Sequence, residues 1–255
     1  MKTLFLALLL TVGGAALADG ATIYSHNFGG SNAAPLHGVA PDVDNNGGTN
    51  AWAAYSGFKA DGTYATNIQR GAFLPFTPAA GNVYALDASF SVNLSASNTW
   101  VALGFAKTVP ANVEGAINRF VEGDSIGRAW TLIRTTTAVN QQFVGGGTAG
   151  ASNWAAAGPS GGGSYDVRIV LDTTAPTYTA TFYAKRPADV AYTQVSSGAL
   201  NLTAADIGAV GFAQNNGAVT AKISKFSLTS IPEPASLTIG IGGIMAVVAA
   251  SRRRK

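Results

Sequence analysis

The chain has 255 residues, of which 47% are hydrophobic and only 11% are charged, and it contains 31 Gly but no Cys. That charged fraction is less than half the roughly 25% of an ordinary soluble domain, which argues against a coiled coil, a classical disordered tail and a nucleic-acid binder with long basic tracts. The lack of Cys excludes disulfides, thiolate zinc sites, iron–sulfur clusters and thiol nucleophiles, and two His residues are too few for a histidine-rich metal centre.

The first eighteen residues have the pattern of a secretory signal peptide. Lys2 supplies a positive start, residues 4–12 are a short apolar stretch, and Ala16-Leu17-Ala18 forms an A-x-A cleavage site. A retained membrane helix is the alternative, but the apolar stretch falls well short of the roughly 20 residues that span a bilayer. We therefore expect signal peptidase to release a mature chain that begins at Asp19.

The body of the chain, residues 19–230, carries strand signals and almost no helix signal. Residues 83–94 alternate apolar and polar side chains with a period of two, as a half-buried strand does. The same style recurs in residues 22–28, 100–106, 129–134, 165–171, 178–184, 210–213 and 221–228. Many short strands separated by Gly-rich turns, without helical crossovers, predict an all-β, antiparallel jelly-roll β-sandwich in one domain.

Three further segments complete this description of the body. Short helical pieces are expected only at residues 113–120 and 202–207, and the second begins with a weak capping-box pattern from Thr203 to Asp206. Residues 227–230 are expected to be the linker between the last strand and the C-terminal tail.

A calcium-loop pattern occurs early in the body. Asp42, Asp44 and Asn46 match the opening D-x-[DN]-x-[DN]-G, which Gly47 completes. The twelfth position is Ala53 instead of the expected Glu, so an EF-hand is excluded. A plain turn is the alternative, because Asn and Asp favour turns and Asn-Gly is a hairpin signal. The sequence requires no cofactor, and calcium is the one metal that this loop suggests.

Aromatic side chains in or beside loops are the candidates for contact with a sugar, because they are the rings most able to present a face to a ligand. With an amide on the same rim, these candidates are Trp52, Tyr55, Trp154 and Asn215. The alternative is that the loop aromatics cover the edges of the sandwich and that Asn215 belongs to a turn. Trp100 and Trp130 lie within predicted strands and are expected in the core.

Catalytic patterns are weak. The body has two Glu, Glu114 and Glu122, and no Glu-x-Asp-x-x-Glu strand, which would place alternate carboxylates on one face for glycoside cleavage. Glu122 and Asp124 are the nearest acidic pair. His26 or His37 would have to serve a Ser–His–Asp triad, but no Ser lies in a Gly-x-Ser-x-Gly turn. We predict that the protein is not an enzyme.

The C-terminus, residues 231–255, has the pattern of a second targeting signal. The tripeptide Pro232-Glu233-Pro234 precedes an almost wholly apolar stretch, residues 235–250, and Ser251 is followed by four cations, Arg252, Arg253, Arg254 and Lys255. An apolar stretch closed by positive charge behaves as a stop-transfer segment. Its length is marginal for a permanent span, although an ordinary tail anchor remains the alternative.

These 25 residues resemble a PEP-CTERM sorting signal, in which a Pro-Glu-Pro motif, a hydrophobic helix and an Arg cluster follow one another in this order. Ile231 stands where Val is commoner. The resemblance implies transient anchoring in the inner membrane of a Gram-negative bacterium that makes exopolysaccharide. It also implies cleavage there by an exosortase, and a final location at the cell surface or in the extracellular matrix.

The order of the strand motifs carries a second resemblance. The segments around Trp100, Trp130, residues 165–173 and residues 210–212 resemble those of secreted bacterial proteins with a concanavalin A-like lectin/glucanase sandwich of the laminin-G-like type. This resemblance covers most of residues 22–229, and it implies a fold more than an activity.

Charge and address together set the expected function. The two terminal signals contain five of the 16 cations and one of the 13 acidic residues, so the net charge of residues 19–230 is near −1. No nucleic-acid partner is therefore expected. We predict a surface or matrix protein that associates with extracellular polysaccharide without catalysis. The alternatives are a purely structural envelope protein without a specific ligand and a divergent carbohydrate-active enzyme.

Overall fold

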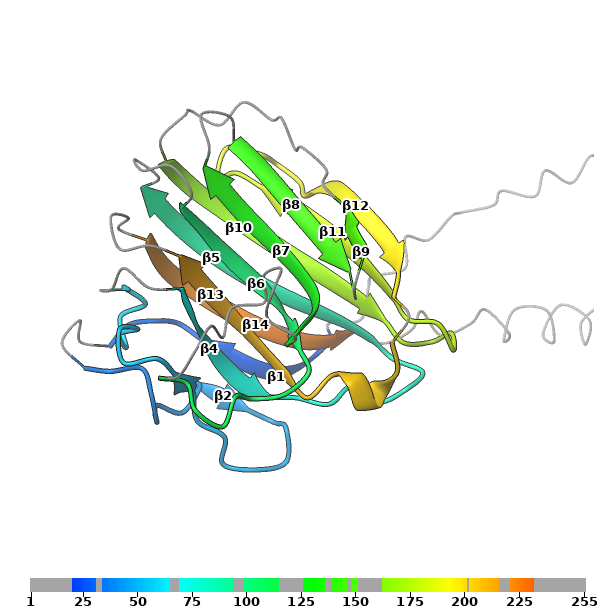
Figure 1. The fold of residues 1–255 in the computed structure, drawn as a ribbon, viewed down its shortest axis with the longest axis horizontal. Helices are drawn as coiled ribbons and strands as arrows, with labels where there is room; N and C mark the ends of the chain where they lie inside the picture. The colour runs from blue at the N-terminus through cyan, green and yellow to red at the C-terminus, as the bar shows by residue number, and fades with distance from the viewer. Residues whose placement is uncertain are drawn as a thin grey trace, which may run out of the picture. The chain divides into compact units, whose positions relative to one another are not determined.

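The alternating strand segments pair into two antiparallel sheets in the computed structural model (Figure 1). The structure describes residues 20–30, 34–64, 69–93, 99–114, 126–135, 139–145, 148–150, 162–200, 202–215 and 221–231. Residues Gly20–Ile231 form one unit. The predicted signal peptide and the predicted sorting tail, including Pro232, Glu233, Pro234 and the cations Arg252 to Lys255, lie outside the described residues.

Each sheet has seven strands among the described residues. Sheet A has the spatial order β12 (Thr193–Ala199), β11 (Thr179–Lys185), β10 (Gly162–Asp172), β5 (Val83–Asn93), β14 (Ala221–Ile231), β1 (Ala21–His26) and β2 (Val43–Asp44). Sheet B has the order β3 (Ala53–Ala54), β4 (Arg70–Pro75), β13 (Ala209–Asn215), β6 (Thr99–Ala106), β7 (Gly127–Thr135), β8 (Val139–Gly145) and β9 (Thr148–Gly150).

The prediction of an all-β, antiparallel sandwich is confirmed. All pairings between these strands are antiparallel, and each strand segment expected from the sequence overlaps an observed strand. The capping-box segment forms a short 3-10 turn, η1 (Ala204–Asp206), in which the Thr203 backbone N–H donates to the Asp206 carboxylate at 2.8 Å. Of the other expected helical piece, residues 113–114 form a turn and residues 115–120 lie outside the described part.

The expectation of a linker at residues 227–230 is wrong. These residues belong to β14 and pair with β5 on one side and β1 on the other, as in the triplet Asp87, Ser227 and Ser25. Phe226 and Leu228 are fully buried, so the alternating pattern holds the strand in the sheet up to Ile231. In Figure 1 this last strand, drawn in orange, lies beside the blue first strand.

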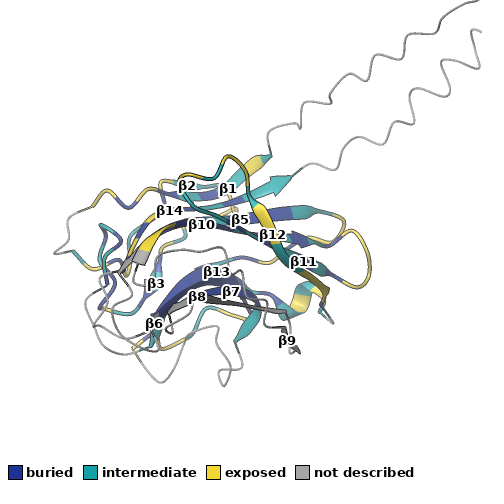
Figure 2. Cartoon of the chain, turned by 90° about the horizontal axis from the view of Figure 1, so that it is seen from above, coloured by how far each residue is buried: buried dark blue, intermediate teal, exposed yellow. Residues whose placement is uncertain are grey.

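The main core lies between the two sheets (Figure 2). Strand β11 shows how the sequence builds it, because its side chains alternate strictly between half-buried and buried positions. Aromatic residues fill much of this space: Tyr24, Phe58, Phe105 and Phe226 each have at most 2% of their surface exposed. Among the described residues, no helix is long and apolar enough to cross a membrane.

Candidate functional site

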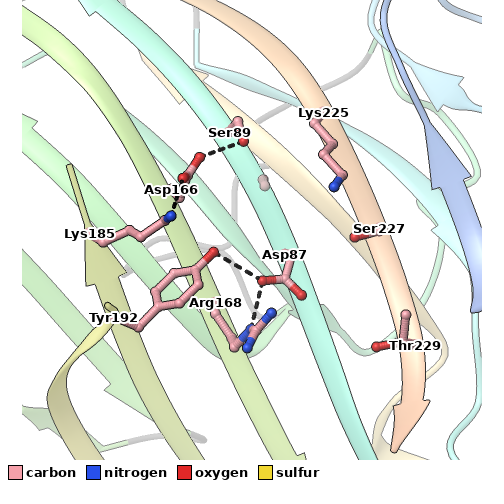
Figure 3. Close-up of a pocket in the computed structure, with 10 residues that line it drawn as sticks. Asp87, Ser89, Asp166, Arg168, Lys185, Tyr192, Lys225, Ser227 and Thr229 are labelled. Carbon is pink, nitrogen blue, oxygen red and sulfur yellow. Dashed lines mark hydrogen bonds and ion pairs between the residues drawn. The ribbon is translucent and has the colours of Figure 1, made fainter. Parts of the chain in front are cut away.

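A polar hollow of about 340 Å³ lies on sheet A (Figure 3). It is lined from four adjacent strands, β11, β10, β5 and β14, and from the segment that precedes β12. The lining residues are Asp87, Ala88, Ser89, Asp166, Arg168, Lys185, Tyr192, Lys225, Ser227 and Thr229.

The strand period of two places these polar side chains on the outer face. On β5, Leu86, Ala88 and Phe90 are buried in the core between the sheets. Asp87 and Ser89, which alternate with them, therefore point away from the core. The same alternation on β10 and β14 sends their charged and hydroxyl side chains to the same side of the sheet.

One row of side chains crosses the sheet at the level of Ser89. Lys185, Asp166, Ser89 and Lys225 are register partners on β11, β10, β5 and β14. The Ser89 hydroxyl donates to one oxygen of Asp166 at 2.6 Å, and Lys185 Nζ lies 3.5 Å from the other. Lys225, at the end of the row, makes no ion pair or hydrogen bond within the part of the chain that the structure describes.

A second row runs beside the first, through Arg168, Asp87 and Ser227. Arg168 Nε donates to Asp87 Oδ1 at 2.7 Å, and the Tyr192 hydroxyl donates to the same oxygen at 3.3 Å. The guanidinium carbon of Arg168 lies 4.7 Å from the centroid of the Tyr192 ring, which is a cation–π distance. Asp87 is thus held by two donors, and one face of the Tyr192 ring is occupied by a cation.

The electrostatic environment fixes the protonation of both donors. Burial lowers the pKa of Arg168, but the hydrogen bond and the charge of Asp87 outweigh burial and raise that pKa above its ordinary value. For Tyr192, burial raises the pKa, and the negative charge of Asp87 raises it further. Arg168 therefore remains a cation and Tyr192 a neutral hydroxyl donor across the physiological range.

The loop aromatics do not contribute to this hollow. Trp52 is only 1% exposed, and its ring packs 5.0 Å from Phe226 and 5.3 Å from Phe212, measured between centroids. The expectation that Trp52 faces a ligand is corrected accordingly, because its indole is in the core between the sheets. Tyr55 directly follows β3 of sheet B, is partly buried, and has the Arg70 guanidinium carbon 5.1 Å from its ring centroid.

Two other predicted contacts cannot be placed at the hollow. Trp154 lies outside the described residues. Asn215 is the last residue of β13 in sheet B, where its backbone pairs with Trp100 on β6.

The Asp42–Gly47 segment is organised by protein hydrogen bonds. Asp44 accepts from the Asn46 and Asn50 backbone N–H groups at 3.2 and 2.7 Å, and from the Asn50 side-chain amide. Asp42 accepts from the backbone and the side-chain amide of Asn27. The Asn46 side chain donates to the Pro75 carbonyl at 3.0 Å. These hydrogen bonds are those of a turn, and among the described residues no three His, Asp or Glu side chains gather as metal ligands.

The residues considered for catalysis have structural partners. The Glu114 carboxylate accepts from the backbone and hydroxyl of Ser56, whereas Glu122 and Asp124 lie outside the described part. His26 is 5% exposed, and burial lowers its pKa despite the charge of Asp42, whose oxygen lies 3.9 Å from its Nδ1. His37 Nδ1 accepts from the Ala54 N–H at 3.3 Å.

The strand tryptophans are buried, as expected, but not between the sheets. Trp100 and Trp130 are 4% and 6% exposed and belong to a second apolar cluster. On β6 the members of this cluster alternate with Val101, Leu103 and Phe105 of the main core, so the second cluster lies on the outer face of sheet B. Small residues form much of it, including Ala102, Ala106, Ala209 and Ala213.

Comparison with known proteins finds likeness in structure only. The chain matches no protein-family profile and no curated protein sequence. Arcelin-5, a lectin-like defence protein from Phaseolus vulgaris, is 13% identical, with a TM-score of 0.45 over 71% of this chain and 92% of its own. The winged bean acidic lectin, solved with methyl-α-D-galactose, is 16% identical, with a TM-score of 0.47 over 81% and 98% of the two chains.

Lectin II from Ulex europaeus is 15% identical, with a TM-score of 0.41 over 77% of this chain and 92% of its own. These three proteins are lectins or lectin-like by name. Likeness at this level defines no shared ligand.

Proposed function

We propose that the sandwich is a non-catalytic carbohydrate-binding module of an exported surface or matrix protein. The observation that carries this proposal is the polar hollow on sheet A. Its volume of about 340 Å³ is within the range of about 300–1,000 Å³ found for small-molecule sites.

The chemistry of the lining suits a sugar. Ser227 and Thr229 offer hydroxyls that both donate and accept hydrogen bonds, and the Ser89 hydroxyl, which donates to Asp166, can still accept. Asp87 and Arg168 add an ionised acceptor and a planar donor. Sugar hydroxyls are themselves donors and acceptors, so such a mixed surface can replace the hydrogen bonds that a glycan makes with water.

The absence of catalysis is supported by how the two acidic side chains of the hollow are held. Asp87 is bound by Arg168 and Tyr192, and Asp166 by Ser89 and Lys185. A carboxylate beside a cation favours its ionised form, so neither acidic side chain is suited to act as a proton donor. Such pairs fix geometry for binding.

A purely structural role is the second candidate, and it has its own supporting observation. The outer face of sheet B is apolar and buried, with Phe73, Leu132 and several alanines fully or almost fully covered. A face of this kind stabilises the domain, and the clustered side chains that the structure describes on it are apolar.

We propose the cellular location of the protein from the sequences of its two termini. Signal peptidase releases the chain at Asp19, and the motif Pro232-Glu233-Pro234 with its apolar stretch and cations directs exosortase processing at the inner membrane of a Gram-negative bacterium. The jelly-roll domain, of the concanavalin A-like type, is then displayed among extracellular polysaccharide.

A glycan screen tests the binding proposal. The full chain, purified in a detergent without a sugar headgroup, is applied to neutral and acidic glycans and to the exopolysaccharide of its host. Saturable binding that free glycan competes away is expected, and heat-unfolded protein serves as the control. If no glycan binds, the structural role is the correct one.

A further inference from the structure

We infer that the hollow on sheet A takes a segment of an anionic polysaccharide, with Lys225 as the cation that pairs with its acidic group. This inference rests on the proposed function and names the class of glycan and the residues that select it.

The charges of the hollow are not balanced. Three cations line it, Arg168, Lys185 and Lys225, against two carboxylates, Asp87 and Asp166. Arg168 is paired with Asp87 and Lys185 with Asp166, which leaves Lys225 unpaired among the described residues. Because residues 19–230 as a whole are near −1, this local excess of positive charge does not follow from the overall composition. An anionic ligand would complete the pairing.

The hydroxyls of β14 continue from Lys225 in one line. Lys225, Ser227 and Thr229 lie along one edge of the hollow (Figure 3). At a strand rise of about 3.3 Å per residue, the line from Lys225 to Thr229 is roughly 13 Å long. That length suits a segment of a polysaccharide better than a single small anion, because the Lys225 charge lies at one end of the line and the hydroxyls of Ser227 and Thr229 follow it.

Tyr192 is the aromatic side chain that lines the hollow among the described residues, and two cations lie against its ring. The Tyr192 ring has the Arg168 guanidinium 4.7 Å from its centroid, and Lys185 Nζ is 5.4 Å from the same point. Recognition that depends on stacking, as for nucleic-acid bases, is therefore disfavoured. Charge and hydrogen bonds remain, which is the chemistry of an acidic sugar with several hydroxyls.

The acidic group can be a carboxylate or a sulfate ester, and the test separates the two. Binding of the full chain to alginate, a polyuronate, to dextran sulfate and to neutral dextran is measured by surface plasmon resonance. Lys225→Ala is compared with Lys222→Ala, which removes an exposed lysine from the same strand but outside the hollow. Thermal melting confirms that both variants are folded.

We expect one acidic polymer to bind, with affinity that falls as salt is added. Lys225→Ala should weaken this binding at least tenfold, Lys222→Ala less than twofold, and Lys225→Arg should restore most of it. An equal loss in the two alanine variants would overturn the inference, because it would indicate a diffuse charge effect. Binding to neutral glycans alone would overturn the inference and leave the proposed function intact, and failure to bind any glycan would overturn both.

Discussion

The indole of Trp52 is enclosed by the rings of His26, Phe28, Phe212 and Phe226, with centroids 5.0–6.1 Å apart. Loop position and side-chain type made Trp52 a candidate for ligand contact, yet aromatic residues are also the largest contributors of buried area. The loop folds inward over the edge of the sandwich, and the ring becomes part of the core. A loop tryptophan can contact a ligand or pack in the core, and contacts with residues far away in the sequence decide between the two.

Trp52→Ala should lower the free energy of unfolding by about 3–5 kcal/mol, because it leaves a large cavity in the core. Trp52→Phe should cost less, since most of the ring is retained. Urea denaturation of the three proteins measures both effects. Val190→Ala is the control, because Val190 is fully exposed, and it should change stability by no more than about 0.5 kcal/mol. An unchanged stability of Trp52→Ala would show that the ring does not pack in the core.

The residues of the hollow could be predicted only in part. Alternation along residues 83–94 and 165–171 already places Asp87, Ser89, Asp166 and Arg168 on a polar face. What joins them is the register between β5 and β10, which pairs Asp87 with Arg168 across 81 positions of sequence. No local pattern in one sequence encodes that register, so the site could not be assembled from the sequence.

At the scale of single elements, the strands that were not predicted show no visible alternation of apolar and polar side chains. Strand β4 has four consecutive buried residues, because both faces of sheet B are covered there. Strand β12 is an exposed edge strand with few apolar side chains. The predicted strands β5 and β11 have one buried and one solvated face, which is the condition for alternation, whereas β6 was predicted although both of its faces are buried.

The segment between β2 and β3 depends on Asp44. Asp44→Ala removes the acceptor for the Asn46 and Asn50 N–H groups and should cost about 1–3 kcal/mol of unfolding free energy. We expect the same loss in melting temperature with calcium and with a chelator. A loss that appears only with calcium would make this segment a metal site.

The cost of Asp44→Ala should depend on pH. Burial raises the pKa of Asp44, but hydrogen bonds from Asn50 and Asn46 outweigh it and hold the pKa below the ordinary 3.8. A carboxyl with a depressed pKa stabilises the fold above its unfolded-state pKa, and the contribution is lost as the pH falls below it. The difference between the two proteins should therefore be constant above about pH 5 and shrink below about pH 4.

At the scale of the whole molecule, the described sandwich ends where the proposed sorting motif begins. Strand β14 runs to Ile231, and Pro232 is the next residue. Because Pro carries no N–H, Pro232 cannot donate the backbone hydrogen bond that would continue the strand pairing.

Replacing Pro232, Glu233 and Pro234 by Ala should leave unprocessed precursor in the inner membrane. Cell fractionation and immunoblotting of the host measure this. Ser236→Ala combined with Thr238→Ala is the control, because it alters the tail beyond the motif and keeps it apolar, and it should be processed normally. Normal surface release of the triple variant would refute the sorting proposal.

The position of β14 also has a mechanical consequence. Lys225, Ser227 and Thr229, which we propose to hold the polysaccharide, stand on the strand that leads directly into the C-terminal tail. Before the tail is cleaved, a pull between a bound polymer and the membrane-held tail would load this one strand along its axis. The backbone of β14 pairs with β5 on one side and β1 on the other. Displacement of β14 along its axis would therefore require many backbone hydrogen bonds to break together, and the strand would resist such a force.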